Sequence, residues 1–159
     1  MTVRGGRRTP DQHNPIIMHC TIHIDGGARG NPGPAGVGVV IQDTANDKYL
    51  HEAGYYLGEA TNNVAEYNGL IKGLEVASEL GAKRVLVVSD SELMVRQING
   101  KYKVKAENLK PLYQQSVALL GRFGKWEMTH TRRENNKLAD QLANRAMDAA
   151  ADVSFSSDD

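Results

Sequence analysis

Alternating apolar and polar residues predict three strands in the first part of the chain, at residues 16–24, 37–41 and 49–57. In the first of these, Cys20, Ile22 and Ile24 alternate with polar residues, as in a strand with one buried face. The glycine- and proline-rich segment 26–36 predicts a turn between the first two strands. Connections this short favour an antiparallel meander.

Apolar residues three and four positions apart then predict four helices, at residues 66–80, 91–98, 109–123 and 138–147. Gly81 ends the first helix, and Pro111 is tolerated because it falls in the first turn of the third. The continuously apolar run 84–89 predicts a strand covered on both faces, and residues 125–131 predict a fifth strand. This order of elements favours an α/β fold with a five-stranded mixed sheet and helices on both faces.

The length of 159 residues suits one domain, which we expect at residues 16–150. We expect a flexible basic tail at 1–15, which is rich in Arg, Gly and Pro, and an acidic disordered tail at 151–159. No apolar run approaches the roughly 18 residues of a membrane span, and the N-terminal arginines are not followed by the apolar stretch of a secretory signal. We therefore expect a cytoplasmic protein with no membrane partner.

Cysteine content and charge narrow the classes further. Cys20 is the only cysteine, which excludes an internal disulfide and a cysteine-based zinc site and fits a reducing compartment. The formal net charge is zero, whereas proteins that bind nucleic acid usually carry a basic excess. Any surface for nucleic acid must therefore be a local patch.

Four acidic residues fall near the ends of predicted elements: Asp25, Glu66, Asp90 and Asp140. Asp25 and Asp90 follow strands, and sites in open α/β sheets form at the carboxyl ends of neighbouring strands. Each residue also has a purely structural interpretation. Asp25 could form a turn, and Glu66 could complete a capping box with Asn63. Asp90 could cap the helix that Ser91 opens, and Asp140 could be a solvated helix residue. Spacing alone does not show that the four converge.

Four ordered blocks resemble signatures of the type 1 ribonuclease H family. They are DGGARGNPGPAG at 25–36, TNNVAEYNGLIKGLE at 61–75, VSDSELMVRQING at 88–100 and RENNKLADQLAN at 133–144. Their order, spacing and placement on strands, turns and helices agree with that family from Ile16 to Met147. The resemblance implies a ribonuclease H-like fold and an endoribonuclease that hydrolyses the RNA strand of RNA–DNA hybrids. We expect such a protein to act as a monomer.

The same blocks imply that Asp25, Glu66, Asp90 and Asp140 are catalytic and hold two Mg²⁺ ions, with Mn²⁺ as a substitute. Hard divalent cations prefer oxygen ligands. Two ions about 4 Å apart can activate an attacking water and stabilise the leaving oxygen of an in-line displacement. The implied products carry 5′-phosphate and 3′-hydroxyl ends. Asp25, on a rigid strand, is our candidate for the ligand that bridges both ions.

The resemblance also implies a set of substrate-binding residues: Gly27, Asn31, Thr61, Asn62, Asn63 and Glu92. Glycine lets backbone approach a nucleic-acid strand where a Cβ would collide, and the amide and hydroxyl side chains suit base edges and phosphates. A simple turn at Asn31 and a helix cap at Asn63 are compatible with these roles. Glu92 departs from the Gln of many family members, so we expect its phosphate contact to be lost or water-mediated.

Two residues compete for an auxiliary catalytic position before the last carboxylate. Many family members have a histidine there that assists proton transfer or product release, which matches His130; others have an arginine, which matches Arg133. We favour Arg133, because an arginine binds phosphate without needing a pKa near 7. His130 also follows Trp126 and Met128 at strand parity, which fits an ordinary strand residue.

The chain lacks the basic helical protrusion of some family members. Residues 100–108 make this connection directly, and Lys101, Lys103 and Lys105 form either a solvated edge or a patch that follows a nucleic-acid backbone. In place of a separate N-terminal hybrid-binding module we expect only the tail with its arginines. Two alternative functions are a relaxed nuclease that also cuts double-stranded RNA and a catalytically silent hybrid-binding module. The four carboxylates argue against silence, because a pure binder gains nothing from clustering like charges.

Overall fold

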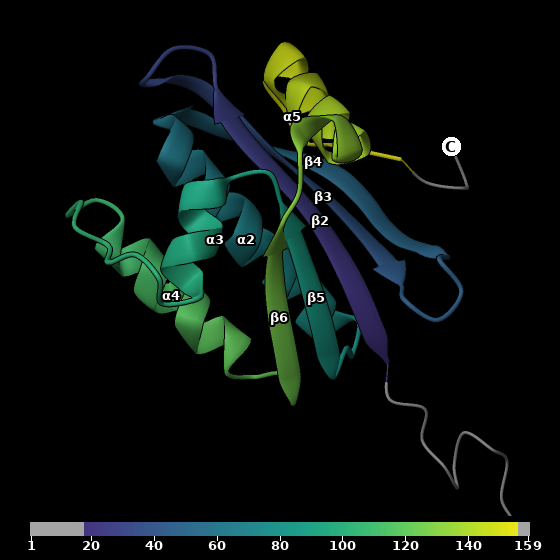
Figure 1. The fold of residues 1–159 in the computed structure, drawn as a ribbon. Coiled ribbons are helices and arrows are strands. Elements are labelled where there is room, and N and C mark those ends of the chain that lie inside the picture. The colour runs from purple at the N-terminus through teal and green to yellow at the C-terminus, as the bar shows by residue number, and fades with distance from the viewer. Residues whose placement is uncertain (1–17, 156–159) are drawn as a thin grey trace, which may run out of the picture.

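A computed structural model describes residues 18–155, which form one mixed sheet with helices on both faces (Figure 1). The strands are β2 (His19–Ala28), β3 (Gly33–Asp43), β4 (Tyr49–Ala60), β5 (Arg84–Ser89), β6 (Lys125–His130) and β7 (Val153–Ser154). Their order across the sheet is β6-β5-β2-β3-β4-β7. The pairs β2–β3, β3–β4 and β4–β7 are antiparallel, whereas the pairs β2–β5 and β5–β6 are parallel. The α/β class, the mixed sheet and the N-terminal meander are therefore confirmed.

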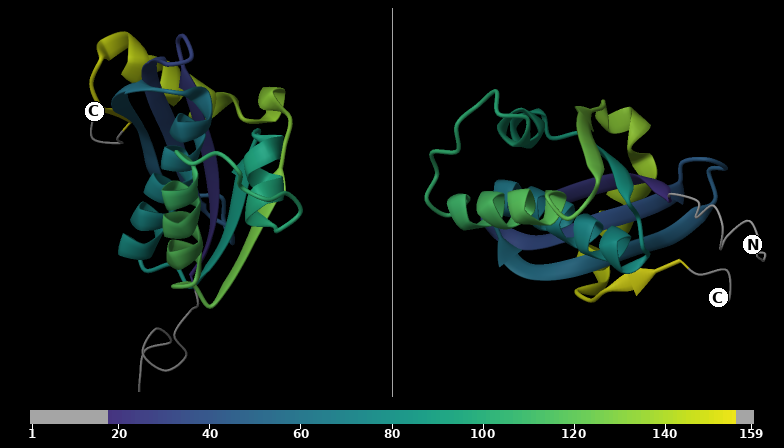
Figure 2. Two further views of the ribbon diagram at one scale, coloured as in Figure 1. Left: turned by 90° about the vertical axis from the view of Figure 1, so that its left-hand side faces the viewer. Right: turned by 90° about the horizontal axis from the view of Figure 1, so that it is seen from below.

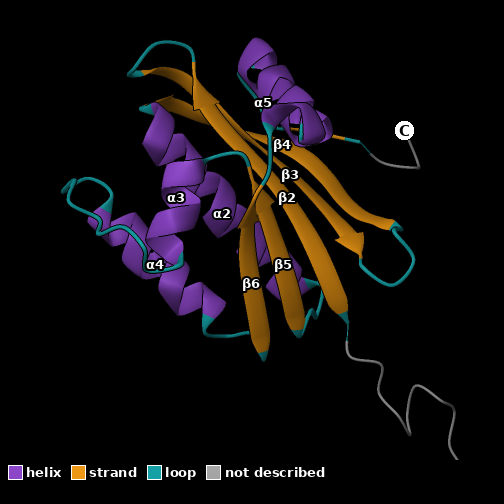
Figure 3. Ribbon diagram, viewed as in Figure 1, coloured by secondary structure: helices purple, strands orange, loops and turns teal. Residues whose placement is uncertain are grey.

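The helices are α2 (Asn62–Glu79), α3 (Glu92–Ile98), α4 (Lys110–Leu120) and α5 (Lys137–Ala149), with a short 3₁₀ turn η1 (Arg133–Asn135) before α5. Helices α2, α3 and α4 lie on one side of the sheet, and α5 crosses the other side alone (Figures 2 and 3). The larger core fills the space under α2, and a smaller cluster of Val40, Ala139 and Leu142 lies under α5. None of the helices in residues 18–155 is both long and apolar enough to span a membrane.

The first strand extends beyond its predicted end. Asp25 was expected to close it, but β2 continues to Ala28 because Gly26, Gly27 and Ala28 keep pairing with β3 in an antiparallel register. The predicted turn at 26–36 is correspondingly wrong and shrinks to residues 29–32. Backbone pairing continues here after the side-chain alternation has stopped, so hydrophobic periodicity underestimates the strand.

A sixth strand corrects both the predicted strand count and the predicted C-terminal tail. Val153 and Ser154 pair with the edge strand β4, and the side chain of Asp152 accepts a hydrogen bond from the backbone N of Tyr56 at 2.9 Å. Disorder was therefore the wrong prediction for residues 151–155. The predicted tail at 1–15 and the last residues, 156–159, lie outside the described part of the chain.

The N-caps of α2 and α3 differ from the structural interpretations offered for Glu66 and Asp90. Thr61, not Asn63, is the N-cap of α2, and its hydroxyl accepts from the backbone N of Val64 at 3.2 Å. Glu66 therefore lies in the second turn, and the capping-box interpretation is wrong. Ser91, not Asp90, caps α3. Both acidic side chains are thus free of a capping role.

Candidate active site

Asp25 and Asp90 lie side by side, each directly after the last residue pair of the parallel β2–β5 ladder. Ile24 of β2 is the register partner of Ser89 of β5 in a parallel ladder, and each is followed directly by an aspartate. The two strands are neighbours, as the topological argument required.

Glu66 reaches this point because α2 packs against β2 without an intervening side chain. A Cβ placed on Gly26 would lie 2.5 Å from the carbonyl oxygen of Ala65 and 2.7 Å from the backbone N of Glu66. No side chain fits in that space. The glycine after Asp25 therefore has a packing role as well as any role in approaching a substrate.

Asp140 comes from the opposite face of the sheet. It lies in the first turn of α5, whose start is tied to β2 by Asn136: its Nδ2 donates to the carbonyl of Ile24 at 2.8 Å. Asp25 and Asp140 line one pocket of about 170 Å³, together with Arg133. Three elements that are distant in sequence thus meet at one end of β2.

Burial and acidic neighbours raise the pKa values of Asp25 and Glu66. Burial raises the pKa of Asp25 to about 8, and the charge of Asp90, a shared hydrogen bond with Asp140 and the charges of Asp140 and Glu66 add to the effect. Burial also raises the pKa of Glu66 to about 7; the Asp90 charge adds to this, whereas a hydrogen bond with Ser91 and the charge of Arg133 oppose it. Such a cluster holds protons at neutral pH unless cations compensate its charge.

Asp90 carries the clearest opening for a cation. Its side chain is 6% exposed, and the nearest cationic atom to its Oδ2 is Nε of Arg133 at 3.6 Å. That oxygen is buried without a hydrogen-bond partner, which is costly for a charged group unless a ligand compensates. Among residues 18–155, no three His, Cys, Asp or Glu side chains already stand in ion-binding geometry. The donor chemistry and the unpartnered oxygen fit a hard divalent cation, with side-chain rotation needed to complete its coordination.

The two candidates for the auxiliary position are separated. Arg133 lies at the carboxylates, beside Asp90, with 81% of its side chain exposed. His130 is an exposed residue at the end of β6, where it is the register partner of Ser89. Position alone favours Arg133; whether it acts in catalysis stays a prediction.

The predicted substrate-binding residues other than Glu92 gather around the start of α2, and the protein itself already engages the polar groups of some of them. The side-chain oxygen of Asn31 accepts from the backbone N of Asn62 at 3.0 Å. Asn62 in turn accepts from the backbone N of Ala28 at 3.2 Å and donates to Glu66 at 3.4 Å. Asn63 is exposed, and Gly27 lines the carboxylate pocket. The nitrogen of Asn31 and the side chain of Asn63 therefore remain available, whereas Asn62 mainly holds the turn against the helix.

Glu92 is not a bare negative charge. Arg96 donates to it through Nε at 2.9 Å and through its terminal nitrogen at 2.7 Å, and this pairing lowers the pKa of Glu92. The expected repulsion of phosphate is thus offset by a guanidinium one helical turn away. The sequence could have predicted this ion pair, because Glu92 and Arg96 are four positions apart on one helix.

Three neighbours of the site were missed. Asn136 anchors α5, Ser91 contacts Glu66, and Arg29 lines the carboxylate pocket while pairing with Asp148 at 2.7 Å. Asn136 stands in the last of the four sequence blocks, four residues before Asp140. Ser91 directly follows Asp90. Arg29 gives no comparable signal, because its partner is 119 positions away along the chain.

The raised pKa values predict how stability depends on pH. Without metal, folded Asp25 and Glu66 hold protons that the unfolded chain, with ordinary pKa values of 3.8 and 4.5, has released. The free energy of unfolding should therefore fall as the pH rises from about 5 to about 8. Urea unfolding in chelator across this range measures the slope, and Asp25→Asn should flatten it. A slope that is the same in both proteins would contradict the proposed cluster.

The family model described as "Reverse transcriptase-like" matches residues 23–146. A bifunctional protein of Mycobacterium tuberculosis is 48% identical over 134 residues, which are 84% of this chain and 37% of that protein. The chain therefore spans little more than a third of that relative. Ribonuclease HI of Halobacterium salinarum is 39% identical over 157 residues, covering 94% of this chain and 76% of the relative.

Solved structures give the same picture. The N-terminal RNase H domain of the Mycobacterium tuberculosis protein superimposes with a TM-score of 0.81 at 47% identity, covering 84% of this chain and 96% of that one. An RNase H1 from compost, solved in complex with an RNA/DNA hybrid, has a TM-score of 0.78 at 46% identity, covering 82% of this chain and 98% of that one.

Proposed function

Because the chain belongs to the type 1 ribonuclease H family, we propose that it hydrolyses the RNA strand of RNA–DNA hybrids. The observation that carries this is the meeting of Asp25, Glu66, Asp90 and Asp140, which raises the pKa values of Asp25 and Glu66 and leaves a buried oxygen of Asp90 unpartnered. A structural or purely binding domain has no use for such an arrangement. The relative solved with a hybrid supports the choice of substrate.

The proposed reaction is an in-line displacement that leaves a 5′-phosphate and a 3′-hydroxyl. Two Mg²⁺ ions, or Mn²⁺ in their place, would supply the activated water and the stabilisation of the leaving oxygen. Asp25 is central to holding them, because it interacts with all three other carboxylates. Arg133, beside Asp90, neutralises charge on the phosphate. The exposed Asn63 and the free amide nitrogen of Asn31 position the strands.

Discrimination for RNA would come from the 2′-hydroxyl, which both donates and accepts. We assign its recognition to Glu66 and to backbone groups of residues 25–31, where the absence of a Cβ at Gly27 leaves room for a strand. A Cβ at Gly27 meets only the side-chain oxygen of Asn62, at 3.5 Å. Space on the protein side is therefore not what requires glycine at this position.

The deciding experiment incubates the full chain with hybrid, RNA duplex, DNA duplex and single strands, in Mg²⁺, in Mn²⁺ and in chelator. We expect cleavage of hybrid alone, only with metal, and 5′-phosphate ends on the RNA fragments. Cleavage of the RNA duplex at a comparable rate would support the relaxed nuclease instead. Hybrid binding without cleavage under every metal condition would support the silent module.

Arg133→Ala should slow turnover at saturating hybrid by about tenfold to a hundredfold, whereas His130→Ala should have little effect. A charge-assisted contact to phosphate is typically stronger than a neutral one, and Nε of Arg133 lies 3.6 Å from Oδ2 of Asp90. Steady-state kinetics across pH on both purified variants makes the comparison. A loss confined to His130→Ala, with an altered pH profile, would assign the auxiliary role to the histidine.

A lysine-rich groove offers a second contact to the hybrid. Lys101, Lys103 and Lys110 line a pocket of about 580 Å³ together with Tyr102 and Tyr113. The same connection continues to a pocket that Asn31 and Asn63 share with Asn108. We propose that the sugar-phosphate backbone of the hybrid runs from the carboxylates along these two pockets. Of the two interpretations of the lysines, this favours a patch that follows a nucleic-acid backbone over a solvated edge.

Replacing Lys101 and Lys103 with Gln should weaken hybrid binding at low salt and reduce the slope of log K against log salt by roughly 0.9 per lost phosphate contact. Turnover at saturation should stay close to wild type. Lys125→Gln, at the far end of β6, is the matched control. An unchanged salt slope in the double variant would return these lysines to a solvated edge.

A further inference from the structure

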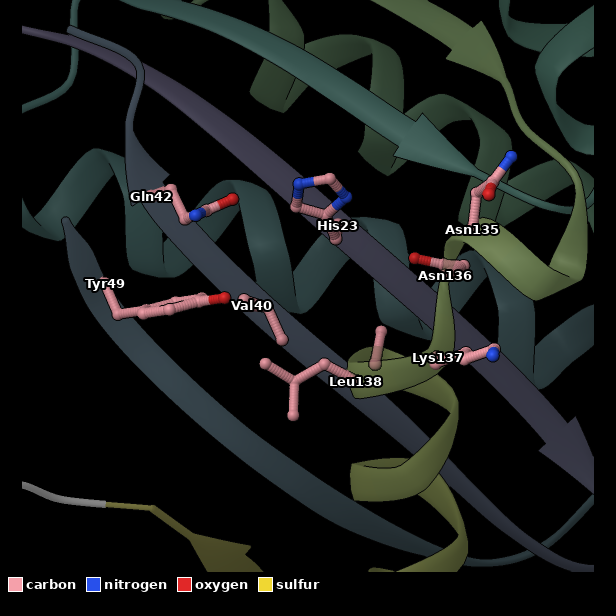
Figure 4. Close-up of a pocket in the computed structure, with 9 residues that line it drawn as sticks. His23, Val40, Gln42, Tyr49, Asn135, Asn136, Lys137 and Leu138 are labelled. Atoms are coloured by element: carbon pink, nitrogen blue, oxygen red, sulfur yellow. The ribbon is translucent and has the colours of Figure 1, made fainter. Parts of the chain in front are cut away.

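A separate pocket lies on the face of the sheet that carries α5, and none of the four carboxylates lines it (Figure 4). Its volume is about 180 Å³. Its walls come from β2, β3, β4 and the beginning of α5, through His23, Val40, Gln42, Tyr49, Asn136 and Leu138. The proposed nuclease activity makes no use of this pocket.

Asn136 aims an unpartnered oxygen into this pocket. The residue is 3% exposed, and its Nδ2 donates to the carbonyl of Ile24 at 2.8 Å, which fixes the orientation of the amide. Its Oδ1 therefore faces the other way, toward the space between His23 and Val40 (Figure 4). This buried oxygen has no hydrogen-bond partner. An occupant that satisfies it must bring a hydrogen-bond donor.

The start of α5 needs a hydrogen-bond acceptor, whereas Oδ1 of Asn136 needs a donor. Asn136 occupies the N-cap position without a side-chain capping bond, and the first backbone N–H groups of a helix have no partner within the helix. The first-turn residues Lys137, Leu138 and Ala139 line the pocket. An occupant here can therefore accept from the backbone beside the point where it donates to Asn136.

The remaining walls limit the shape of the occupant. Val40 and Leu138 provide apolar surface, and the half-exposed ring of Tyr49 lies along the opening with its hydroxyl toward Val40 (Figure 4). His23 and Gln42 are hydrogen-bonded to each other, and Gln42 also donates to the carbonyl of Asp47 at 3.1 Å. Their polar groups are largely used, which leaves Asn136 and the helix start as the specific contacts.

We propose that this pocket binds a nucleobase that carries an exocyclic amine beside a ring nitrogen, as adenine and cytosine do. The amine donates to Oδ1 of Asn136, the ring nitrogen accepts from a backbone N–H at the start of α5, and the flat ring lies against Tyr49, Val40 and Leu138. An inorganic anion satisfies the helix start but not Asn136. The base can come from a free nucleoside or from an unpaired residue of a strand.

The test follows the backbone amide resonances of residues 136–139 by NMR while adenosine is added to the full chain. Purine riboside, which lacks the amine, is the matched ligand, and it should bind about tenfold more weakly because it leaves Oδ1 unsatisfied. The titration is run in chelator and in Mg²⁺, and binding is expected in both. A short single-stranded oligoadenylate distinguishes the sources: tighter binding than adenosine assigns the pocket to strand ends, and equal binding assigns it to nucleosides.

Tyr49→Ala should weaken adenosine binding by about tenfold, since base–aromatic contacts contribute strongly, and should leave cleavage of hybrid unchanged. Tyr102→Ala is the matched control, because the two tyrosines are 52% and 50% exposed. Non-saturating shifts, equal affinity for adenosine and purine riboside, or binding only with Mg²⁺ would each overturn the proposal. The same shifts produced by inorganic phosphate would do so too. These outcomes are independent of whether the chain cleaves hybrids.

Discussion

Asp25→Asn should abolish cleavage and, in chelator, make the protein more stable. Activity should fall by at least about 10³-fold, which corresponds to roughly 4 kcal/mol of transition-state stabilisation, because Asp25 is the carboxylate that interacts with Asp90, Asp140 and Glu66 together. The same substitution removes one of four mutually repelling groups, while the new amide can still donate to Asp140. Turnover measured with and without Mg²⁺ tests the loss of cleavage, and thermal unfolding under the same conditions tests the gain in stability.

Asp148→Asn is the appropriate control for this experiment. Asp148 lies on α5, as Asp140 does, but its side chain is 67% exposed and paired with Arg29, so neither activity nor metal-dependent stability should change appreciably. Added Mg²⁺ should raise the melting temperature of wild type and of the control more than that of Asp25→Asn. Near-normal turnover of Asp25→Asn would remove the basis for the metal assignment.

The site was predictable where it depends on strand order. Asp25 and Asp90 come at the ends of predicted strand segments, and the topological rule brings such residues together when their strands are neighbours, as β2 and β5 are. That argument places two carboxylates together without any side-chain detail. Glu66 and Asp140 could be assigned only through the family resemblance, because their positions depend on how closely α2 and α5 approach the sheet.

The strand segments that the sequence did not predict are stabilised by backbone hydrogen bonds. β7 contains only Val153 and Ser154, within a segment whose composition is typical of disorder, and it exists because β4 offers an unpaired edge. β2 continues through Gly26 and Gly27 for the same reason, without any apolar side chain to mark it. Hydrophobic periodicity reports burial of side chains, so elements that rest on pairing alone escape it.

Side-chain partners at the site were hidden in a different way. The Asn31–Asn62–Glu66 chain of hydrogen bonds joins a turn to a helix across 31 positions and then 4. Asn31 and Asn62 were both singled out as contacts to nucleic acid, yet Asn62 has both ends of its amide engaged by the protein. Residue type indicated the correct region of the surface, whereas the division between binding and supporting residues needed the geometry.

Gly38→Ala should be the most damaging substitution outside the carboxylates. Gly38 is the register partner of Asp25 on β3, and a Cβ there would lie 1.8 Å from the carbonyl oxygen of Ala139. That oxygen belongs to helix backbone and cannot rotate away, so α5 must lift from the sheet. Overpacking of this kind costs roughly 3 kcal/mol, or about 10 °C in melting temperature for a chain of this size. Because Asp140 directly follows Ala139, its displacement should also lower turnover by about a hundredfold.

Gly121→Ala is the control, since its nearest neighbour lies 3.5 Å away and its φ of −65° suits alanine. Thermal unfolding and hybrid cleavage on both variants distinguish the outcomes: equal stability of the two would show that α5 does not depend on this contact, and stability lost without activity would show that Asp140 keeps its place when the helix moves.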